Sequence, residues 1–453
     1  MSHHHKRKNR TGGNRESLVA RIDTLLLYGS FGLLMFGPIA FGAVEPWSMF
    51  VLEAGAVFLT LLWLSKQWLN AEIVLIWNPL FLPMAFFGVL ILVQITFRLS
   101  AYRHDTLSEA MLYCAYAMLC FLATQVLRRS SQARRIALIL AVFGFAVAAF
   151  ALVQGVAPNG KLYWLRVPRL GGWIYGPYVN HNHYAGLMEM LVPIPLIISL
   201  SHLAHEKARI AAGVGAAIMV GTVFLSGSRG GMLAIFVELG IFAAILFREK
   251  KSLRVAIGVA AFVVVLISLL VWLGGKELTT RVGSISSETR GEISGGMRLS
   301  IDRDAIRMFR SKPVLGWGLG TFPVVYPQFR SFYTNFFVNE AHNDYAQLLV
   351  EMGLLGFGTM IWYLIVVFKQ VRRKLGKWST DVNSAVTLAC SLGVAGILVH
   401  SLVDFNLQIP ANAAWFYVFT AIAASRPLLQ RARKARPPVS AEEQEFFPES
   451  EVV

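Results

Sequence analysis

The sequence has few charged residues. They make up 15% of the 453 positions, whereas a soluble globular protein usually carries about 25%. Hydrophobic residues make up 55%, and many of them fall in apolar runs long enough to cross a bilayer as a helix. This composition excludes an ordinary soluble domain and predicts an integral membrane protein.

Cysteine is also scarce, since the chain has 3. Cys114, Cys120 and Cys390 lie inside apolar stretches, so we expect no disulfide framework. We expect no cleavable signal peptide either. The first apolar run begins near Leu25 after a basic arm, has no small-residue cleavage site, and is followed at once by another run. It is therefore predicted to be retained as a membrane helix.

Acidic residues are the rarer of the two charges, with 26 Asp and Glu against 42 Lys and Arg and a formal net charge of +16. Such an excess is often found in nucleic-acid-binding proteins. Here the cations lie between apolar stretches, and most fall in alternate connecting segments, as the positive-inside rule requires. We expect a multi-pass protein of the inner (cytoplasmic) membrane, with both termini in the cytoplasm and no nucleic-acid partner.

The expected fold is an all-α polytopic membrane protein of about twelve transmembrane helices. The predicted spans are residues 24–43, 49–65, 73–97, 107–127, 136–157, 184–202, 208–225, 229–247, 255–274, 346–368, 383–402 and 410–425. Residues 1–22 form a basic cytoplasmic arm, residues 23–425 the membrane domain, and residues 426–453 a basic-then-acidic tail that is expected to be disordered. The loops 158–183 and 275–345 are expected on the periplasmic side, and the second should contain helix.

Cations gather in these outer loops, against the usual rule. Long loops are translocated largely regardless of charge, which accounts for most of them. It does not account for Arg229, a cation at the end of a span in the turn Ser-Gly-Ser-Arg-Gly-Gly, which needs a partner or a ligand. Ser228 is placed to cap the next helix, and the glycines permit close approach of a ligand. Backbone N–H groups and a guanidinium together make an anion site.

Residues 171–186 are rich in turn formers and in side chains that hydrogen-bond sugars. The candidate substrate-binding residues are Asn180, His181, Asn182, His183 and Tyr184. The alternative, an interfacial aromatic belt with a capping Asn, is about equally favoured. Metal binding by the two histidines is disfavoured, because no Cys, Asp or third His lies nearby in the sequence. We expect no metal and no cofactor.

A large outer loop contains an amphipathic helix from residue 296 to Pro313, expected to lie on the membrane. Its apolar arc consists of Ile301, Ala305, Ile306, Met308 and Phe309. Arg303, Arg307 and Arg310 lie on the opposite side, as a solvated or headgroup-facing stripe does. Arg298 falls within the apolar arc, so it is a candidate ligand for a buried anion.

The segment Asn-Glu-Ala-His-Asn-Asp-Tyr precedes the tenth span. A lone histidine at a membrane interface is more often an ordinary polar residue. His342 is nevertheless a candidate general base, because histidine titrates near neutral pH. Glu340 and Asp344 flank it and are expected to orient it and raise its basicity. Asn343 and Tyr345 complete the set of candidate substrate-binding residues.

These motifs together resemble the O-antigen ligase and O-antigen polymerase superfamily of bacterial membrane glycosyltransferases. The resemblance rests on the turn around Arg229, on Arg298 followed by Pro-Val-Leu-Gly-Trp-Gly-Leu-Gly-Thr-Phe, and on the segment Glu-Ala-His-Asn-Asp-Tyr-Ala-Gln-Leu-Leu-Val-Glu-Met-Gly around His342. The last motif is the most specific. The Asn-His-Asn-His-Tyr-Ala-Gly segment and the order of spans also fit, so the resemblance covers residues 25–425, and only the tail lacks a counterpart.

The resemblance implies a GT-C-like helical bundle and a donor glycan on a polyprenyl diphosphate of the undecaprenyl type. It implies that Arg229 and Arg298 bind the diphosphate and that His342 is the base of an inverting, metal-independent transfer at the periplasmic face. An O-antigen ligase transfers to lipid A–core. An O-antigen or exopolysaccharide polymerase, or a protein O-oligosaccharyltransferase, uses the same donor chemistry, and the sequence does not separate these alternatives.

A lipid-linked-sugar transporter is disfavoured, because the arginines lie at outer span ends and no internal repeat is evident. Glu189, Glu238 and Glu351 are acids in or near predicted spans. They are expected either to pair with the arginines or to satisfy one another.

Overall fold

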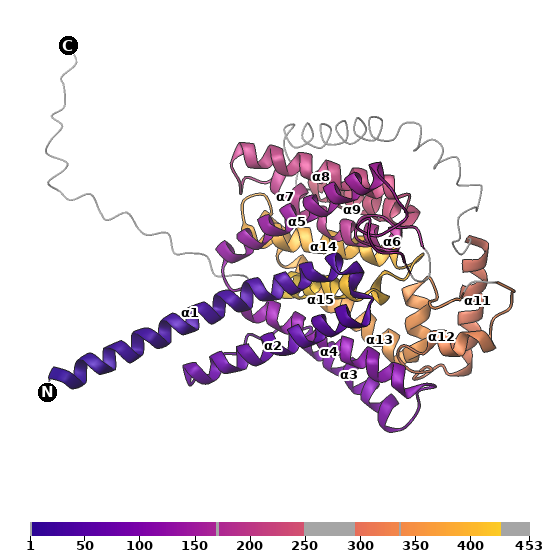
Figure 1. The fold of residues 1–453 in the computed structure, drawn as a ribbon, viewed down its shortest axis with the longest axis horizontal. Helices are drawn as coiled ribbons and strands as arrows, with labels where there is room; N and C mark the ends of the chain where they lie inside the picture. The colour runs from indigo at the N-terminus through magenta and orange to yellow at the C-terminus, as the bar shows by residue number, and fades with distance from the viewer. Residues whose placement is uncertain (1, 169–171, 249–294, 335–336, 427–453) are drawn as a thin grey trace, which may run out of the picture.

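The computed structural model describes residues 2–168, 172–248, 295–334 and 337–426. These residues form helices joined by loops, and they contain no β-strand (Figure 1). The predicted span 255–274, most of the tail and parts of both long outer loops lie outside the described residues. The all-α class is confirmed for the rest of the chain.

The helices follow one another closely along the chain. The first five are α1 (Ser2–Ile39), α2 (Pro46–Asn70), α3 (Phe81–Thr96), α4 (Arg103–Val126) and α5 (Ser130–Val156). The middle group is α6 (His181–Leu191), α7 (Pro193–Leu200), α8 (Glu206–Ser226) and α9 (Arg229–Arg248). The last group is α11 (Gly295–Ser311), α12 (Phe322–Val325), α13 (Asp344–Arg372), α14 (Val382–His400) and α15 (Pro410–Ala424). The short 3-10 turns are η1 (Phe41–Ala43), η3 (Tyr326–Gln328), η4 (Leu375–Lys377) and η5 (Asn406–Gln408).

Within the described residues, 9 helical segments are long and apolar enough to cross a membrane. They are Arg15–Ile39, Pro46–Asn70, Arg103–Val126, Ser130–Val156, His181–Leu200, Glu206–Ser226, Arg229–Leu246, Asp344–Lys377 and Val382–His400. Helix α3 is apolar but shorter, and α15 has 15 residues. The protein is therefore a polytopic membrane protein, while the predicted number of twelve spans is not confirmed.

Two predicted spans differ from the helices observed. The third begins at Phe81 rather than at residue 73, because the residue before a proline avoids the α conformation and Asn78 precedes Pro79. The Asn78 amide instead donates to the Ala421 carbonyl at 3.0 Å and so ties the start of α3 to α15. The sixth span is divided into α6 and α7 at Pro193, since proline interrupts the hydrogen-bond ladder of a helix.

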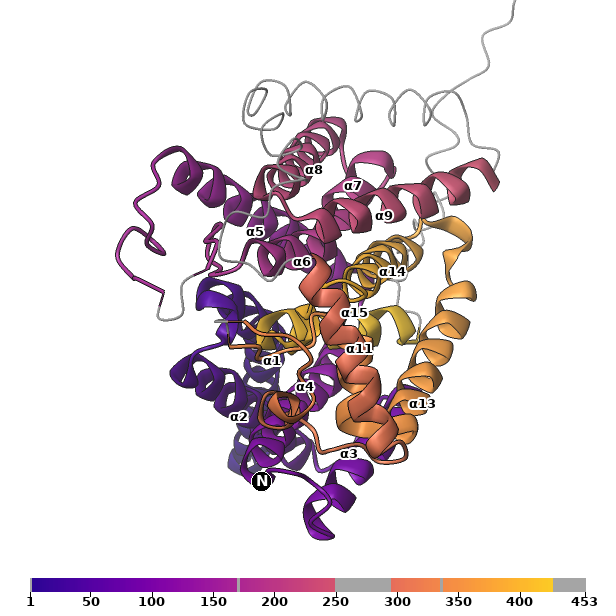
Figure 2. The same ribbon diagram turned by 90° about the vertical axis from the view of Figure 1, so that its right-hand side faces the viewer.

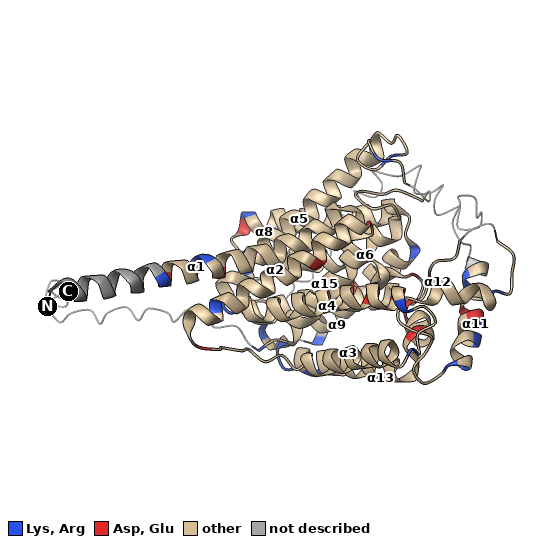
Figure 3. Cartoon of the chain, turned by 60° about the horizontal axis from the view of Figure 1, so that its bottom comes forward, with Lys and Arg blue, Asp and Glu red and all other residues tan. Residues whose placement is uncertain are grey.

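Helices α14 and α15 form the centre of the bundle, and the other membrane helices pack around them (Figure 1). Helix α15 contains no charged residue, and nearly all of its residues are buried inside the protein. Helix α11 crosses the bundle at one end instead of running along it, as Figure 2 shows from that end. Lys and Arg lie mainly near helix ends and in the loops, and long central sections of helix carry no charge (Figure 3).

The buried face of α11 differs in part from the predicted apolar arc. Ile301, Ala305 and Met308 are buried as predicted, but Ile306 is 50% exposed. The predicted arc was wrong there because Asp304 occupies the buried side, where it accepts hydrogen bonds from the Ser331 N–H at 2.9 Å and the Tyr326 hydroxyl at 3.2 Å.

Arg307 is not a purely solvated member of the predicted stripe. Its guanidinium pairs with Asp304 and donates to the Phe329 carbonyl at 3.0 Å. Arg307, one of the three arginines of the predicted stripe, thus forms an ion pair with the buried Asp304 carboxylate. We expect this charge to stabilise the local fold.

A glycine-rich loop after α11 is held against α13 by a buried carboxylate. Glu351 accepts hydrogen bonds from the Gly320 N–H at 2.9 Å and the Phe322 N–H at 3.1 Å. Gly353 has φ +62, and a Cβ there would lie 2.4 Å from the Val314 carbonyl oxygen. Of the two alternatives expected for Glu351, pairing with an arginine is not what the structure shows, because backbone donors of this loop occupy its oxygens.

Close packing of α14 against α6 gives a testable stability difference. A Cβ on Gly393 would lie 2.6 Å from the Met190 carbonyl oxygen, whereas a Cβ on Gly358 would meet nothing within 4 Å. We expect Gly393→Ala to lower the free energy of unfolding by about 1–3 kcal/mol through overpacking. Thermal unfolding in detergent measures this, with Gly358→Ala as the matched control. Equal midpoints for the two variants would contradict the packing.

Candidate functional site

A buried carboxylate lies in the loop between α14 and η5. The Asp404 side chain is 1% exposed, and three basic side chains surround it. The Arg298 Nη2 is 3.7 Å from Oδ2, the His342 Nδ1 is 3.8 Å from Oδ1, and the His183 Nε2 is 4.0 Å from Oδ1. We call these four residues the Asp404 cluster. It joins α11, the loop before α13, and α6, which are far apart in the sequence.

Backbone contacts fix the geometry of the cluster. The Phe405 N–H donates to the Asp404 Oδ1 at 2.8 Å, and the Arg298 Nη1 donates to the Val403 carbonyl at 2.8 Å. The Phe405 ring meets both imidazoles edge to face, with centroids 4.7 Å from His183 and 4.8 Å from His342. One loop therefore positions the carboxylate, the guanidinium and both rings.

His342 itself has an unusual backbone. Its φ is +55, in the left-handed region that a non-glycine residue adopts at a cost. The residues on both sides are held in place: the Ala341 N–H donates to Gln347 Oε1 at 3.0 Å, and the Asp344 N–H donates to the Ser401 carbonyl at 3.0 Å. These bonds overcome the local preference and direct the imidazole toward Asp404.

The charges around Asp404 keep it ionised. Burial by itself would raise the pKa of the Asp404 carboxyl, but the neighbouring His342 imidazole, the Arg298 guanidinium and His183 act in the opposite direction. The net result is a pKa well below the usual range. A carboxylate that is charged, buried and next to an imidazole nitrogen is suited to hold a proton on Nδ1 and leave Nε2 able to accept one.

The predicted partners of His342 were wrong. The Glu340 side chain accepts a hydrogen bond from Gln347, and burial together with the charge of Glu351 raises the pKa of Glu340 well above its usual value. The Asp344 carboxylate accepts from the Ser401 hydroxyl at 2.7 Å, the Leu407 N–H at 3.0 Å and the Gln408 amide at 3.2 Å. Both acids therefore hold the fold around the site, and their hydrogen bonds go to groups other than His342.

Several other sequence candidates have structural partners. Asn180 caps α6, with its side chain accepting from the Asn182 N–H at 2.8 Å. The Tyr184 hydroxyl donates to Thr222 at 2.7 Å, and the Tyr345 hydroxyl donates to the Leu398 carbonyl at 2.7 Å.

Asn343 caps α13 through the Tyr345 and Ala346 N–H groups, and its amide donates to Asp302 at 3.3 Å. His181 is buried under the Trp173 ring, with centroids 4.3 Å apart. Of the nine predicted substrate-binding residues, His183 is the one that belongs to the Asp404 cluster.

The turn before α9 contacts the same loop as the cluster. Ser228 caps α9 as predicted, since its hydroxyl accepts from the Gly231 N–H at 3.1 Å. A Cβ on Gly230 would lie 2.3 Å from His400 and 3.0 Å from Val403, the residue before Asp404. Gly230 therefore serves close helix packing rather than the predicted approach of a ligand. Arg229, the first residue of α9, is exposed at this turn.

A second buried acid–base pair lies beneath this turn. The His400 Nδ1 is 3.1 Å from Glu189 Oε2, and its Nε2 is 3.5 Å from the Ser228 hydroxyl. Glu189 therefore pairs with a histidine, which neither of the two expectations for this acid included. Glu238, which is also buried, has no hydrogen-bond partner for Oε1 among the described residues.

A family model described as O-antigen ligase matches residues 214–361. Residues 214–361 belong to the O-antigen ligase family. The O-antigen ligase segment contains Arg229, Arg298 and His342, whereas His183 and Asp404 lie outside it. No curated protein matches the chain.

The O-antigen ligase assignment and the apolar helices together indicate a multi-pass bacterial membrane protein of the ligase or glycosyltransferase type, with lipid-linked glycans as its substrate class. In the parts of the chain that the structure describes, no group of three or more His, Cys, Asp or Glu side chains is arranged to hold a metal ion.

Sequence reasoning missed Asp404 and His400. Asp404 had a detectable signal, because an acid in a short loop between two apolar spans is expensive unless it is paired. The motifs that predicted the site were built around Arg and His and did not include this loop.

The role of Asp344 as a structural acid is testable. We expect Asp344→Ala to lower the free energy of unfolding by at least about 2 kcal/mol, because it leaves buried donors of the α14–α15 connection without an acceptor. Unfolding by heat in detergent measures the loss. The control is Asp105→Ala in the first turn of α4, which should shift the midpoint little. An Asp344→Ala protein as stable as the wild type would contradict this assignment.

Proposed function

We propose that the protein transfers a glycan from a polyprenyl-diphosphate-linked donor to an acceptor hydroxyl, as an O-antigen ligase that acts on lipid A–core at the periplasmic face of the inner membrane. The observation that carries the proposal is the convergence of Arg298, His342 and His183 on one buried carboxylate. Two of these residues lie inside the segment that matches the O-antigen ligase family.

His342 is the proposed general base. The acceptor hydroxyl hydrogen-bonds to its Nε2, while Asp404 faces Nδ1 and stabilises the positive charge that develops on the ring. As the acceptor oxygen attacks the anomeric carbon, its proton passes to Nε2, the new glycosidic bond forms, and the bond from the anomeric carbon to the diphosphate oxygen breaks. A single displacement of this kind inverts the anomeric centre.

Arg229 and Arg298 are the proposed ligands of the diphosphate. A guanidinium suits this task, because it donates several hydrogen bonds in a fixed plane to phosphate oxygens. The Arg298 side chain is 26% exposed, so part of its guanidinium remains accessible beside Asp404. The Arg229 turn packs against the residue before Asp404 through Gly230. Charge on the departing diphosphate grows in the transition state, where both cations stabilise it most.

The polymerase alternative shares this donor chemistry and differs in the acceptor. Purified protein in detergent with EDTA is given undecaprenyl-diphosphate-linked glycan, with lipid A–core in one tube and donor alone in another. We expect glycan on lipid A–core. A ladder of longer donors would indicate a polymerase. No transfer by folded protein to either acceptor would contradict both.

Substitutions in the proposed machinery give a graded prediction. We expect His342→Ala to reduce transfer by about 10²–10⁴-fold, because the proton acceptor is lost. Arg298→Gln should also reduce transfer strongly, whereas Arg303→Ala on the same helix should have little effect. Initial rates in the lipid A–core assay measure this, with monodispersity in detergent as the control for folding. Wild-type rates without the His342 imidazole would remove it as the base.

A further inference from the structure

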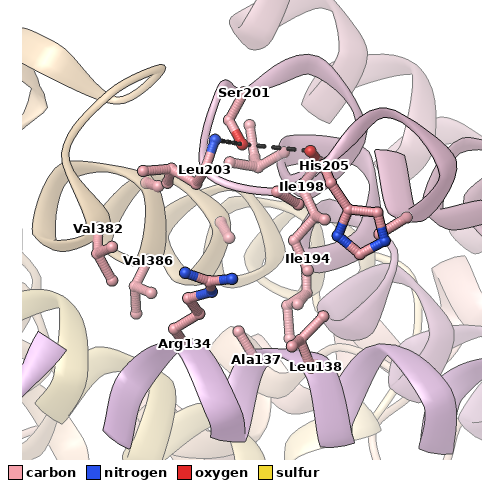
Figure 4. Close-up of a pocket in the computed structure, with 15 residues that line it drawn as sticks. Arg134, Ala137, Leu138, Ile194, Ile198, Ser201, Leu203, His205, Val382 and Val386 are labelled. Carbon is pink, nitrogen blue, oxygen red and sulfur yellow. Dashed lines mark hydrogen bonds between the residues drawn. The ribbon is translucent and has the colours of Figure 1, made fainter. Parts of the chain in front are cut away.

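A cavity of about 90 Å³ opens at the end of the bundle opposite the Asp404 cluster (Figure 4). The first turns of α5 and α14, the end of α7 and the loop into α8 surround it. The Asp404 cluster lies instead near the start of α6 and α13 and the end of α14. The lining is mostly aliphatic, with Leu138, Ile194, Ile198, Val382 and Val386, and it also includes Ser201 and His205.

One charged side chain enters this apolar space. Figure 4 shows the Arg134 guanidinium among the aliphatic side chains of α7 and α14. Among the described residues, Arg134 has no hydrogen bond or ion pair. Arg134 is itself an exposed residue, so its guanidinium is accessible to an anionic partner. Asp381, the acid that precedes the lining residue Val382, caps α14 by accepting from the Ser384 N–H at 2.9 Å.

The cavity has the depth of a lipid site. Arg134 is the fifth residue of α5, and Ala389, the innermost lining residue of α14, is its eighth. At 1.5 Å per residue, the lining therefore extends about 10 Å from the start of α14. This depth corresponds to the boundary between lipid headgroups and acyl chains. Further cations lie at the same end of the helices, which favours negatively charged lipids: Arg128, Arg129, Arg135, Lys207 and Arg209.

We propose that this cavity binds an anionic glycerophospholipid, with the phosphate headgroup on Arg134 and a section of one acyl chain between α5, α7 and α14. The leaflet is the one opposite the Asp404 cluster. The bilayer itself supplies such a ligand at this depth, and the aliphatic lining together with one unpaired guanidinium matches both of its parts. The site is separate from the proposed transfer reaction and does not depend on it.

The test measures lipid retention by native mass spectrometry of the full-length protein in detergent. Phosphatidylglycerol and phosphatidylcholine with identical acyl chains are titrated in parallel. We expect the wild type to retain phosphatidylglycerol preferentially. Arg134→Gln should weaken phosphatidylglycerol binding about fivefold and remove the preference, because that is the contribution of one Lys or Arg near a negatively charged membrane surface. The matched control, Arg135→Gln, changes the neighbouring arginine, which is exposed like Arg134 but does not line the cavity.

A second variant tests the apolar part of the site. Ala137 lines the cavity, and Ala137→Phe should fill it and reduce retention of both lipids. Unfolding midpoints in lipid-free detergent must match the wild type for each variant. Equal retention of the two lipids by the wild type, or equal losses in Arg134→Gln and Arg135→Gln, would overturn the proposal, since either result means only diffuse binding to the protein surface.

Discussion

The structure of the site depends on one constraint, the burial of the Asp404 charge. A carboxylate that is 1% exposed loses its hydration, and the cost is met only where cations and hydrogen-bond donors replace the water. Arg298 provides the positive charge, the His342 and His183 imidazoles lie beside the carboxylate, and the Phe405 N–H provides a hydrogen bond. Four separate segments of chain must therefore meet at this point. The left-handed backbone of His342 is one local consequence of that meeting.

Much of the fold was predictable from the sequence, because apolar length alone identifies helices that cross a bilayer. The Ser228 cap was also predictable, since capping is a local interaction. Arg298 does turn inward from α11, although toward a carboxylate of the protein. The start of α3 and the exposure of Ile306 were missed, because each depends on a distant contact: Asn78 with α15, and Asp304 with the loop around Ser331.

The partner of His342 shows most clearly why sequence neighbours mislead. Glu340 and Asp344 each lie two residues from His342 in the sequence, but the Glu340 carboxylate accepts from Gln347 and the Asp344 carboxylate accepts from Ser401. The acid that does face the imidazole comes from a later loop, and no spacing rule connects the two.

The two ends of the bundle also differ. One end contains the buried Asp404 carboxylate, and the other contains a mostly apolar cavity with a single arginine.

The central claim is that Asp404 acts on the reaction through His342, and the most direct measurement is the rate of transfer by Asp404→Asn. The substitution preserves size and hydrogen-bonding shape but removes the charge that faces Nδ1. The account predicts a folded protein whose rate of transfer to lipid A–core falls by about 10²-fold or more across the pH range, while Asp105→Asn stays near the wild type. A folded Asp404→Asn protein with the wild-type rate would contradict the account.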